Sequence, residues 1–198
     1  LDQRGMGTTL TAMVVVPDGG PGPRLAVLNV GDSRTYVARA GRLRRVTIDH
    51  SYVQELVSTG HISELEARNH PRRNIVTRAL GIEPSVRVDT WVLPFVRGDR
   101  YVLCSDGLVD EVDDDQIAKI LAVHPSPQAA AEALVEAALH NGGRVNVTVV
   151  VVDAMEGDEP PAADADLEID LSWDEADEAA ERLVDAEPDA AVASGDTE

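Results

Sequence analysis

The sequence predicts an α+β domain, in which hairpin-connected strands come before most of the helices. Its first half holds short apolar and β-branched runs separated by brief turns, and Ala40-Gly41-Arg42 is typical of a hairpin loop. Most helix-like segments follow these runs instead of alternating with them, which favours the α+β class. Strands are expected at 8–16, 25–30, 35–39, 43–47, 86–93, 101–104 and 146–152. Helices are expected at 52–58, 63–68, 114–123 and 126–140.

The last expected helix is marked at both ends. Ser126 is a favoured N-cap residue, and Pro127 follows at the first helical position, where its missing N–H is not needed. The glycine pair Gly142-Gly143 ends the helix. A face of small residues is expected to lie close on a sheet. These residues are Ala130, Ala133, Leu134, Ala137 and Ala138.

The stretch Tyr101–Gly107, which reads YVLCSDG, is the most informative part of the chain. Its apolar residues form a short buried strand, preceded by the turn residues Gly98 and Asp99. Asp106 stands where this strand leaves the core, which is a suitable place for a carboxylate ligand of Mg²⁺ or Mn²⁺. An ordinary turn aspartate is the alternative interpretation, and the three letters SDG alone favour it.

Two further strands carry a glycine and polar residues at one end. LAVLNVGDSR (residues 25–34) ends at Gly31 and Asp32, and NGGRVNVTVVVV (residues 141–152) begins with a glycine pair. Three strand ends of this kind indicate one rim of a sheet at which several loops converge. Asp32 joins Asp106 as a candidate ligand, with turn formation as the alternative role.

Six motifs in order resemble the metal-dependent protein serine/threonine phosphatases of the PPM (type 2C-like) family, bacterial type. The resemblance covers roughly residues 5–153. It implies two packed antiparallel β-sheets flanked by helices, an αββα sandwich. It also implies a cytoplasmic signalling hydrolase that cleaves phosphoserine and phosphothreonine in protein substrates. The motifs are GMGTT (5–9), GDSR (31–34), TIDHS (47–51), HPRRNIVTRALG (70–81), GDRYVLCSDGL (98–108) and GGRVNVTVVVV (142–152).

The resemblance assigns the cofactors and the residues that hold them. Two catalytic Mg²⁺ or Mn²⁺ ions are expected, with a third, weaker one. Asp106 matches an aspartate that contacts the catalytic pair, and Asp32 together with Asp106 matches the site of the third ion. Such a metal pair activates a water for attack on phosphorus, so Ser33 and Ser105 are not expected to act as nucleophiles.

Two departures from the family pattern affect the expected activity. The family reads GG-x-Asp-Asn where this chain has Val145, and a valine cannot coordinate a cation. The N-terminal part of the domain, which carries the phosphate-binding arginine, an aspartate-glycine pair and a histidine in the family, has no counterpart after Leu1. The chain is therefore expected to be a fragment with no catalytic residue of its own and weak or no activity. The alternative is an inactive relative that binds phosphoproteins or regulates.

Residues that follow the first hairpins resemble the family's flap, a helical excursion beside the active site that influences substrate choice. Arg72, Arg73 and Arg78 make this stretch basic and are candidate contacts for a phosphorylated substrate. A solvated basic surface is the simpler alternative. Its histidines His50, His61 and His70 are assigned no catalytic role.

Charge divides the chain near Met155. Residues 156–198 hold 17 of the 36 acidic residues and one base, Arg182, which predicts a disordered acidic tail after a 1–155 phosphatase domain. The net charge of −19 argues against nucleic-acid binding. No apolar run is long enough for a membrane span, and the lone Cys104 excludes an internal disulfide. A cytoplasmic monomer is expected.

Overall fold

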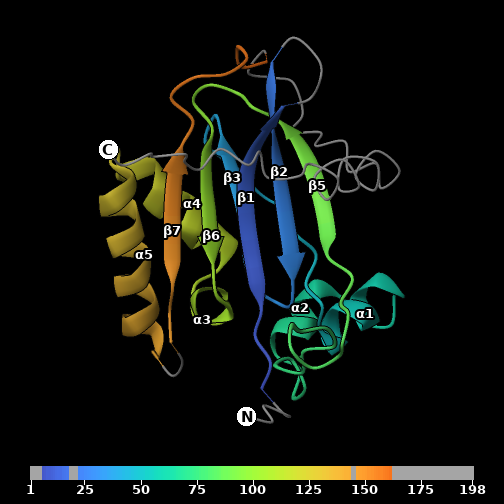
Figure 1. Ribbon diagram of the computed structural model, residues 1–198. Coiled ribbons are helices and arrows are strands. Elements are labelled where there is room, and N and C mark those ends of the chain that lie inside the picture. The colour runs from blue at the N-terminus through green and yellow to red at the C-terminus, as the bar shows by residue number, and fades with distance from the viewer. Residues whose placement is uncertain (1–5, 18–21, 144–145, 162–198) are drawn as a thin grey trace, which may run out of the picture.

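The computed structural model describes residues 6–17, 22–143 and 146–161, which form two antiparallel β-sheets packed face to face (Figure 1). The expected α+β class and its two packed antiparallel sheets are confirmed. One sheet has the order β1-β2-β5, and the other has the order β4-β3-β6-β7. The strands are β1 (Leu10–Pro17), β2 (Pro23–Val30), β3 (Arg34–Arg39), β4 (Arg42–Arg45), β5 (Asp89–Pro94), β6 (Arg100–Cys104) and β7 (Val149–Asp153).

Helices flank the sheets at two places. The longer helices pack on the outer face of the four-stranded sheet, with α5 alongside β7, and α1 and α2 lie beyond one end of the strands near α3 (Figure 1). No helix within the described ranges is both long and apolar enough to cross a lipid bilayer. The helices are α1 (Tyr52–Ser58), α2 (Glu64–Arg68), α3 (Asp106–Val109), α4 (Asp114–Val123) and α5 (Pro127–Asn141).

Strand register builds the core between the sheets. Val27 of β2 pairs with Met13 of β1 on one side and with Trp91 of β5 on the other, so these three side chains share the inner face. Alternation along the strands adds residues two positions away to the same face. The resulting apolar core contains Leu25, Val27, Val37, Val46, Trp91, Leu93, Tyr101 and Ala154.

A second core lies between the four-stranded sheet and the helices. Burial of both faces of β3 and β6 explains why YVLC reads as a continuous apolar run, and Cys104 is a free, buried thiol as expected. The small-residue face of α5 packs here as well, because Ala130, Leu134 and Ala138 are fully buried. At its N-terminus the Ser126 side chain accepts a hydrogen bond from the Ala129 amide, so the expected cap is confirmed.

The expected element boundaries differ from the structure mainly near loops. The strand expected at 86–93 begins at Asp89, and the one expected at 146–152 begins at Val149. Helix α3 is absent from the helices that the sequence predicts. It is a single turn that is stabilised by the complete burial of Leu108, a tertiary contact that local sequence does not reveal.

The flap consists of residues 52–75 and is closed at its base. Ser51 and Val76 form an antiparallel bridge, and the Tyr52 amide donates a 2.9 Å hydrogen bond to the Ile75 carbonyl. The Thr77 amide donates to the His50 carbonyl at 2.8 Å, which extends the closure by one step. The two ends of the flap therefore leave the sandwich side by side.

Ion pairs with at least partly buried partners fix the end of the sheets opposite the flap. Arg39 holds Asp99 through two hydrogen bonds of 2.6 Å, and the Tyr101 hydroxyl donates to the same carboxylate at 3.1 Å. Arg100 pairs with Asp153, and its remaining N–H groups bond to backbone carbonyls at the end of α4 and just beyond it. These contacts join β3, β6, β7 and α4.

The chain remains bonded to the domain beyond the boundary expected at Met155. The Asp158 amide donates to the Phe95 carbonyl at 2.7 Å, and the Arg97 amide donates to the Asp158 carbonyl at 2.9 Å. Most of the predicted tail, residues 162–198, lies outside the described residues.

Candidate functional site

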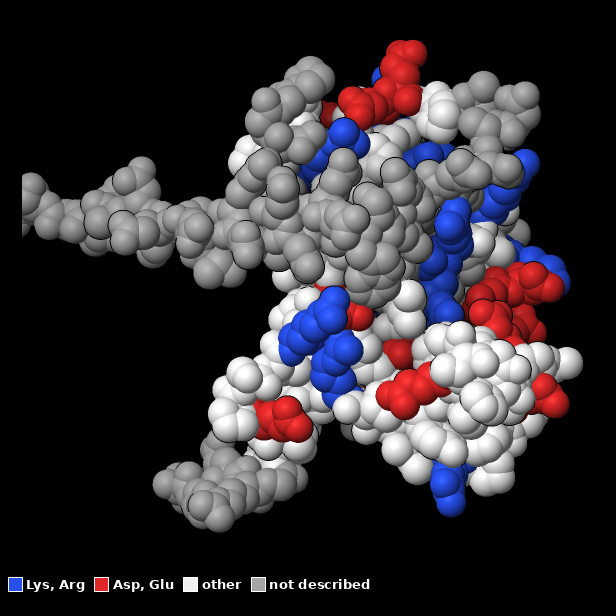
Figure 2. All heavy atoms as spheres, turned by 90° about the vertical axis from the view of Figure 1, so that its right-hand side faces the viewer, with Lys and Arg blue, Asp and Glu red and all other residues white. Residues whose placement is uncertain are grey.

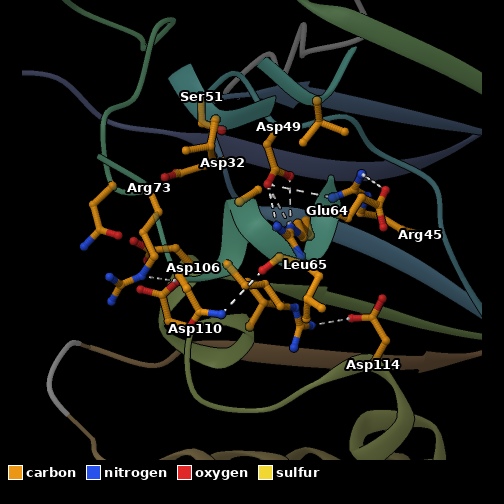
Figure 3. A pocket seen from close by; sticks show the side chains of 18 residues that line it. Asp32, Arg45, Asp49, Ser51, Glu64, Leu65, Arg73, Asp106, Asp110 and Asp114 are labelled. Carbon is orange, nitrogen blue, oxygen red and sulfur yellow. Dashed lines mark hydrogen bonds and ion pairs between the residues drawn. The ribbon is translucent and has the colours of Figure 1, made fainter. Parts of the chain in front are cut away.

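Loops from both sheets converge on a pocket at the end of the sandwich that carries the flap. Its volume is about 500 Å³, and it lies between α1, α2 and α3 (Figure 3). Carboxylates from four places along the chain meet in this region, and arginines lie among them (Figure 3). The acidic lining residues are Asp32, Asp49, Glu64, Asp106, Asp110 and Asp114, and the basic ones are Arg34, Arg45, Arg68 and Arg73.

Asp32 is held at the pocket by the turn that ends β2. The preceding residue, Gly31, has a φ of +106°, a conformation that L side chains rarely adopt. A Cβ atom at this position would also collide with the Thr9 side chain. Glycine is therefore required immediately before the carboxylate, and the backbone direction that brings Asp32 to the pocket follows from it.

Asp106 is the first residue of α3 and lies two residues after the end of β6. Its Oδ1 atom accepts a 2.8 Å hydrogen bond from the Gly107 amide, which orients the carboxylate at the start of the helix. The neighbouring Ser105 hydroxyl accepts a 3.0 Å hydrogen bond from the Thr148 amide. This contact joins the Asp106 turn to the strand that follows the glycine pair, as the predicted convergence of loops requires.

The structure adds Asp110 to the two predicted aspartates. Asp110 follows α3, four residues after Asp106, and its amide donates a 2.9 Å hydrogen bond to the Asp106 carbonyl. Residues at this spacing share one side of a helical turn. The spacing could have identified Asp110 from the sequence, had a helix been predicted here.

Negative charge is concentrated between these aspartates. Burial, followed by the charge of Asp106, raises the pKa of Asp32 from its ordinary value to about 6. The pKa of Asp110 is also raised, first by burial, although Arg73 opposes the shift. Carboxylates in this situation favour a proton or a cation. The donor set therefore fits a hard divalent cation such as Mg²⁺ or Mn²⁺.

The described residues do not complete such a site. Among residues 6–17, 22–143 and 146–161, no group of three or more potential ligand side chains is close enough to hold a metal ion. A cation held by Asp32 and Asp106 would therefore need further ligands. Val145, the position at which the family has an aspartate, lies outside the described residues.

Asp49 belongs to the floor of the pocket, and its charge is already balanced. Arg34 donates to both of its oxygens, from Nε at 2.9 and 3.0 Å and from Nη2 at 2.6 Å. Arg34 also donates to the Tyr36 hydroxyl, which in turn donates to Asp114. This network fixes the floor without leaving a free carboxylate. No sequence signal marks this pairing, because it depends on the geometry of the β3–β4 hairpin.

The three arginines predicted as substrate contacts lie in different places. Arg73 lines the pocket, with its Nε atom 3.9 Å from Asp110. The guanidinium of Arg72 lies over the Tyr52 ring at 5.7 Å from its centroid. Arg78 donates a 2.6 Å hydrogen bond to Asp89. Of the three, the geometry favours Arg73 as a contact for an anionic substrate.

On the side that carries β5 and α1, basic and acidic side chains lie next to one another (Figure 2).

The raised pKa of Asp32 makes stability depend on pH. Because the folded state binds this proton more tightly than the unfolded state, the free energy of unfolding should fall as the pH rises from about 4 to about 6. In chelator at pH 8, Asp32→Asn is expected to stabilise the protein by about 1 kcal/mol, after allowance for its partial exposure. At pH 4 the two proteins should unfold alike. Urea denaturation at both pH values measures the difference, with exposed Glu83→Gln as the control, and an equal effect at both values would contradict the assignment.

The chain is similar in sequence to curated serine/threonine phosphatases. No family model matches the sequence. The serine/threonine phosphatase stp of Listeria welshimeri is 43% identical over 153 residues, which cover 77% of this chain and 59% of that protein. The chain thus spans about three fifths of this relative.

Solved structures show the same fold. The PPM Ser-Thr phosphatase MsPP from Mycobacterium smegmatis, in complex with cacodylate, matches with a TM-score of 0.69 and 44% identity over 77% of this chain and 66% of its own. The catalytic domain of the serine/threonine protein phosphatase PstP, in complex with two manganese ions, matches with a TM-score of 0.64 and 42% identity over 78% of this chain and 62% of its own.

Proposed function

Because the chain belongs to the PPM (type 2C-like) family of metal-dependent protein serine/threonine phosphatases, we propose that it is part of an enzyme that hydrolyses phosphoserine and phosphothreonine in cytoplasmic proteins. The observation that carries this proposal is the meeting of Asp32, Asp106 and Asp110 at one pocket, with the pKa of Asp32 raised to about 6. The manganese ions of the PstP structure support the same chemistry.

Asp106 and Asp32 would hold the metal in this proposal. When bound, Mg²⁺ or Mn²⁺ makes hydroxide available at neutral pH and neutralises charge on phosphoryl oxygens. Asp106 is fixed for this role by the Gly107 amide, and Asp32 is fixed by the glycine turn before it. Arg73, on the flap side of the pocket, is placed to attract the phosphorylated segment of a substrate.

A second function, that of an inactive phosphoprotein-binding or regulatory relative, is favoured by one specific feature. Val145 stands where the family has an aspartate, which removes an anionic oxygen ligand from the set. With fewer ligands, we expect this chain to bind Mn²⁺ in the millimolar range.

Turnover of a phosphothreonine peptide tests the proposed function. The full 198-residue chain should release phosphate slowly in excess Mn²⁺, and both chelation and Asp106→Asn should abolish the release, because each empties the site. Asp115→Asn, on the first turn of α4, is the matched control and should keep the wild-type rate. Metal-independent turnover would contradict the proposal. Peptide binding without any turnover would favour the inactive relative.

A further inference from the structure

A buried polar cluster lies directly behind the Asp32 turn. His50 and Asp89 are each 7% exposed and neither lines the pocket, whereas Arg78 reaches them from the residues that follow the flap. Buried groups of this kind require hydrogen-bond partners. The partners of His50 include both backbone polar groups of Gly31.

His50 forms two hydrogen bonds with the backbone of Gly31. The Gly31 amide donates to His50 Nδ1 at 3.0 Å, and the His50 amide donates to the Gly31 carbonyl at 2.9 Å. The Asn29 side-chain amide donates to the same carbonyl at 3.1 Å. Gly31 has no side chain of its own, so these backbone contacts are the means by which the turn before Asp32 can be held.

The contacts also determine which imidazole nitrogen carries the proton. Because the Gly31 N–H is a donor, Nδ1 must accept, and in the neutral ring the proton is then on Nε2. Nε2 lies 2.9 Å from Asp89 Oδ2 and donates to it. The Arg78 Nη1 atom donates to Asp89 Oδ1 at 2.6 Å, so the guanidinium and the ring N–H share the Asp89 carboxylate as acceptor. Nη1 also lies 2.8 Å from Nε2, and with the proton on Nε2 that approach is a contact between two donors and not a hydrogen bond.

Asp89 stays ionised in this cluster. Burial alone would raise its pKa, but the hydrogen bonds from His50 and Arg78 outweigh that effect and lower it. An ionised carboxylate is a strong acceptor for the Nε2 proton and fixes both the tautomer and the orientation of the ring. The contacts therefore run in series from Asp89 through His50 and Gly31 to Asp32.

We propose that His50 is a positioning residue that holds Asp32 in the orientation needed to bind a divalent cation. The proposal rests on the proposed function, in which Asp32 is a metal ligand. Supporting groups that orient metal ligands typically change metal affinity by 10- to 100-fold when they are replaced. The two ring nitrogens of His50 have separate tasks. Nδ1 accepts from the Gly31 amide and so holds the turn, whereas Nε2 donates to Asp89 and so fixes the orientation of the ring.

Two substitutions separate these tasks. Asparagine has an oxygen that can take the place of Nδ1, so His50→Asn keeps an acceptor for the Gly31 amide and loses the link to Asp89. Glutamine has an amide nitrogen near the place of Nε2, so His50→Gln keeps the link to Asp89 and loses the acceptor. Both variants give up ring packing, and both are expected to lower the stability of the domain.

Two measurements on the full chain test the proposal. Hydrogen exchange at the Gly31 amide should be at least about tenfold faster in His50→Gln than in His50→Asn, because the Gln variant frees the amide locally. Line broadening at the Asp32 and Asp106 amides during titration with Mn²⁺ should show that His50→Gln weakens binding about tenfold or more. His50→Asn should stay within about threefold of wild type in both measurements.

The outcomes distinguish this proposal from the function on which it rests. If exchange at Gly31 and the affinity for Mn²⁺ change only in proportion to each variant's loss of stability, His50 has a merely structural role. That result would overturn the proposal. If the wild-type chain binds no Mn²⁺, the proposed function fails for this chain, while hydrogen exchange still decides whether His50 holds the turn. If His50→Gln does not fold, His50→Leu takes its place, because leucine likewise offers no acceptor to the Gly31 amide. Exchange at Gly31 should again be faster than in His50→Asn, relative to the core amides, and an equal rate would contradict the proposal.

Discussion

Val145→Asp should tighten the binding of Mn²⁺ by about a hundredfold, because it adds an anionic oxygen ligand to the incomplete set formed by Asp32 and Asp106. Metal-dependent hydrolysis of para-nitrophenyl phosphate should rise at least about as much, since a key electrostatic group commonly contributes 10²–10³ in rate. Calorimetry measures the affinity, and release of the coloured product measures the rate.

Matched variants separate charge from shape at this position. Val145→Asn has nearly the size of the aspartate without its charge and should recover little of the gain. Combining Val145→Asp with Asp106→Asn should remove the gain, because the two carboxylates act on the same ions. If the wild-type protein already binds Mn²⁺ as tightly as its aspartate variant, the valine is tolerated and the inactive alternative fails.

Asp99→Ala is expected to lower the free energy of unfolding by about 3 kcal/mol or more. The Asp99 carboxylate is fully buried, and its removal leaves Arg39 and the Tyr101 hydroxyl without their shared acceptor. Urea denaturation measures the loss. Because this pair lies at the end of the sheets opposite the pocket, the affinity for Mn²⁺ in the folded protein should not change.

Two comparisons show whether burial causes this loss. Arg97→Ala breaks the exposed contact of Arg97 with Glu159 and should cost less than about 1 kcal/mol. Replacing both partners, with Arg39→Met and Asp99→Leu together, should recover much of the stability, because no buried charge is left unpaired. A loss in the double variant equal to that of Asp99→Ala would show that ion pairing is not the cause.

Much of the candidate site can be predicted from the sequence of each strand considered separately. Asp106 and Asp32 are identified because each comes directly after an apolar run, and a residue at a strand end has little freedom to face elsewhere. Asp110 is missed because its place depends on α3, whose single turn is stabilised by burial of Leu108 and not by local sequence. His50 is recognised as a polar residue of a motif, but its contact with Gly31 joins residues 19 positions apart.

The fold is predicted well where local signals are strong. The helices at 52–58 and 114–123 match the structure, because an N-cap residue precedes each of them. Strand ends are less certain, since pairing decides them. β5 begins at Asp89, the residue that pairs with Asn29 of β2, and no sequence signal marks that register. The separate roles of Arg72, Arg73 and Arg78 likewise depend on partners supplied by distant segments.

Because its base is closed, the flap should be replaceable as a unit without disturbing the sandwich. Because Ser51 and Val76 are already paired, the 24 positions between them form a loop whose ends are fixed by the sandwich. Doubling the length of such a loop costs only about 0.6 kcal/mol in closure entropy. Grafts that are joined at these two residues should therefore change the flap side of the pocket while Asp32 and Asp106 keep their places. Under the proposed function, the substrate range could diversify through one short stretch of the gene, without renewed selection on the proposed metal ligands.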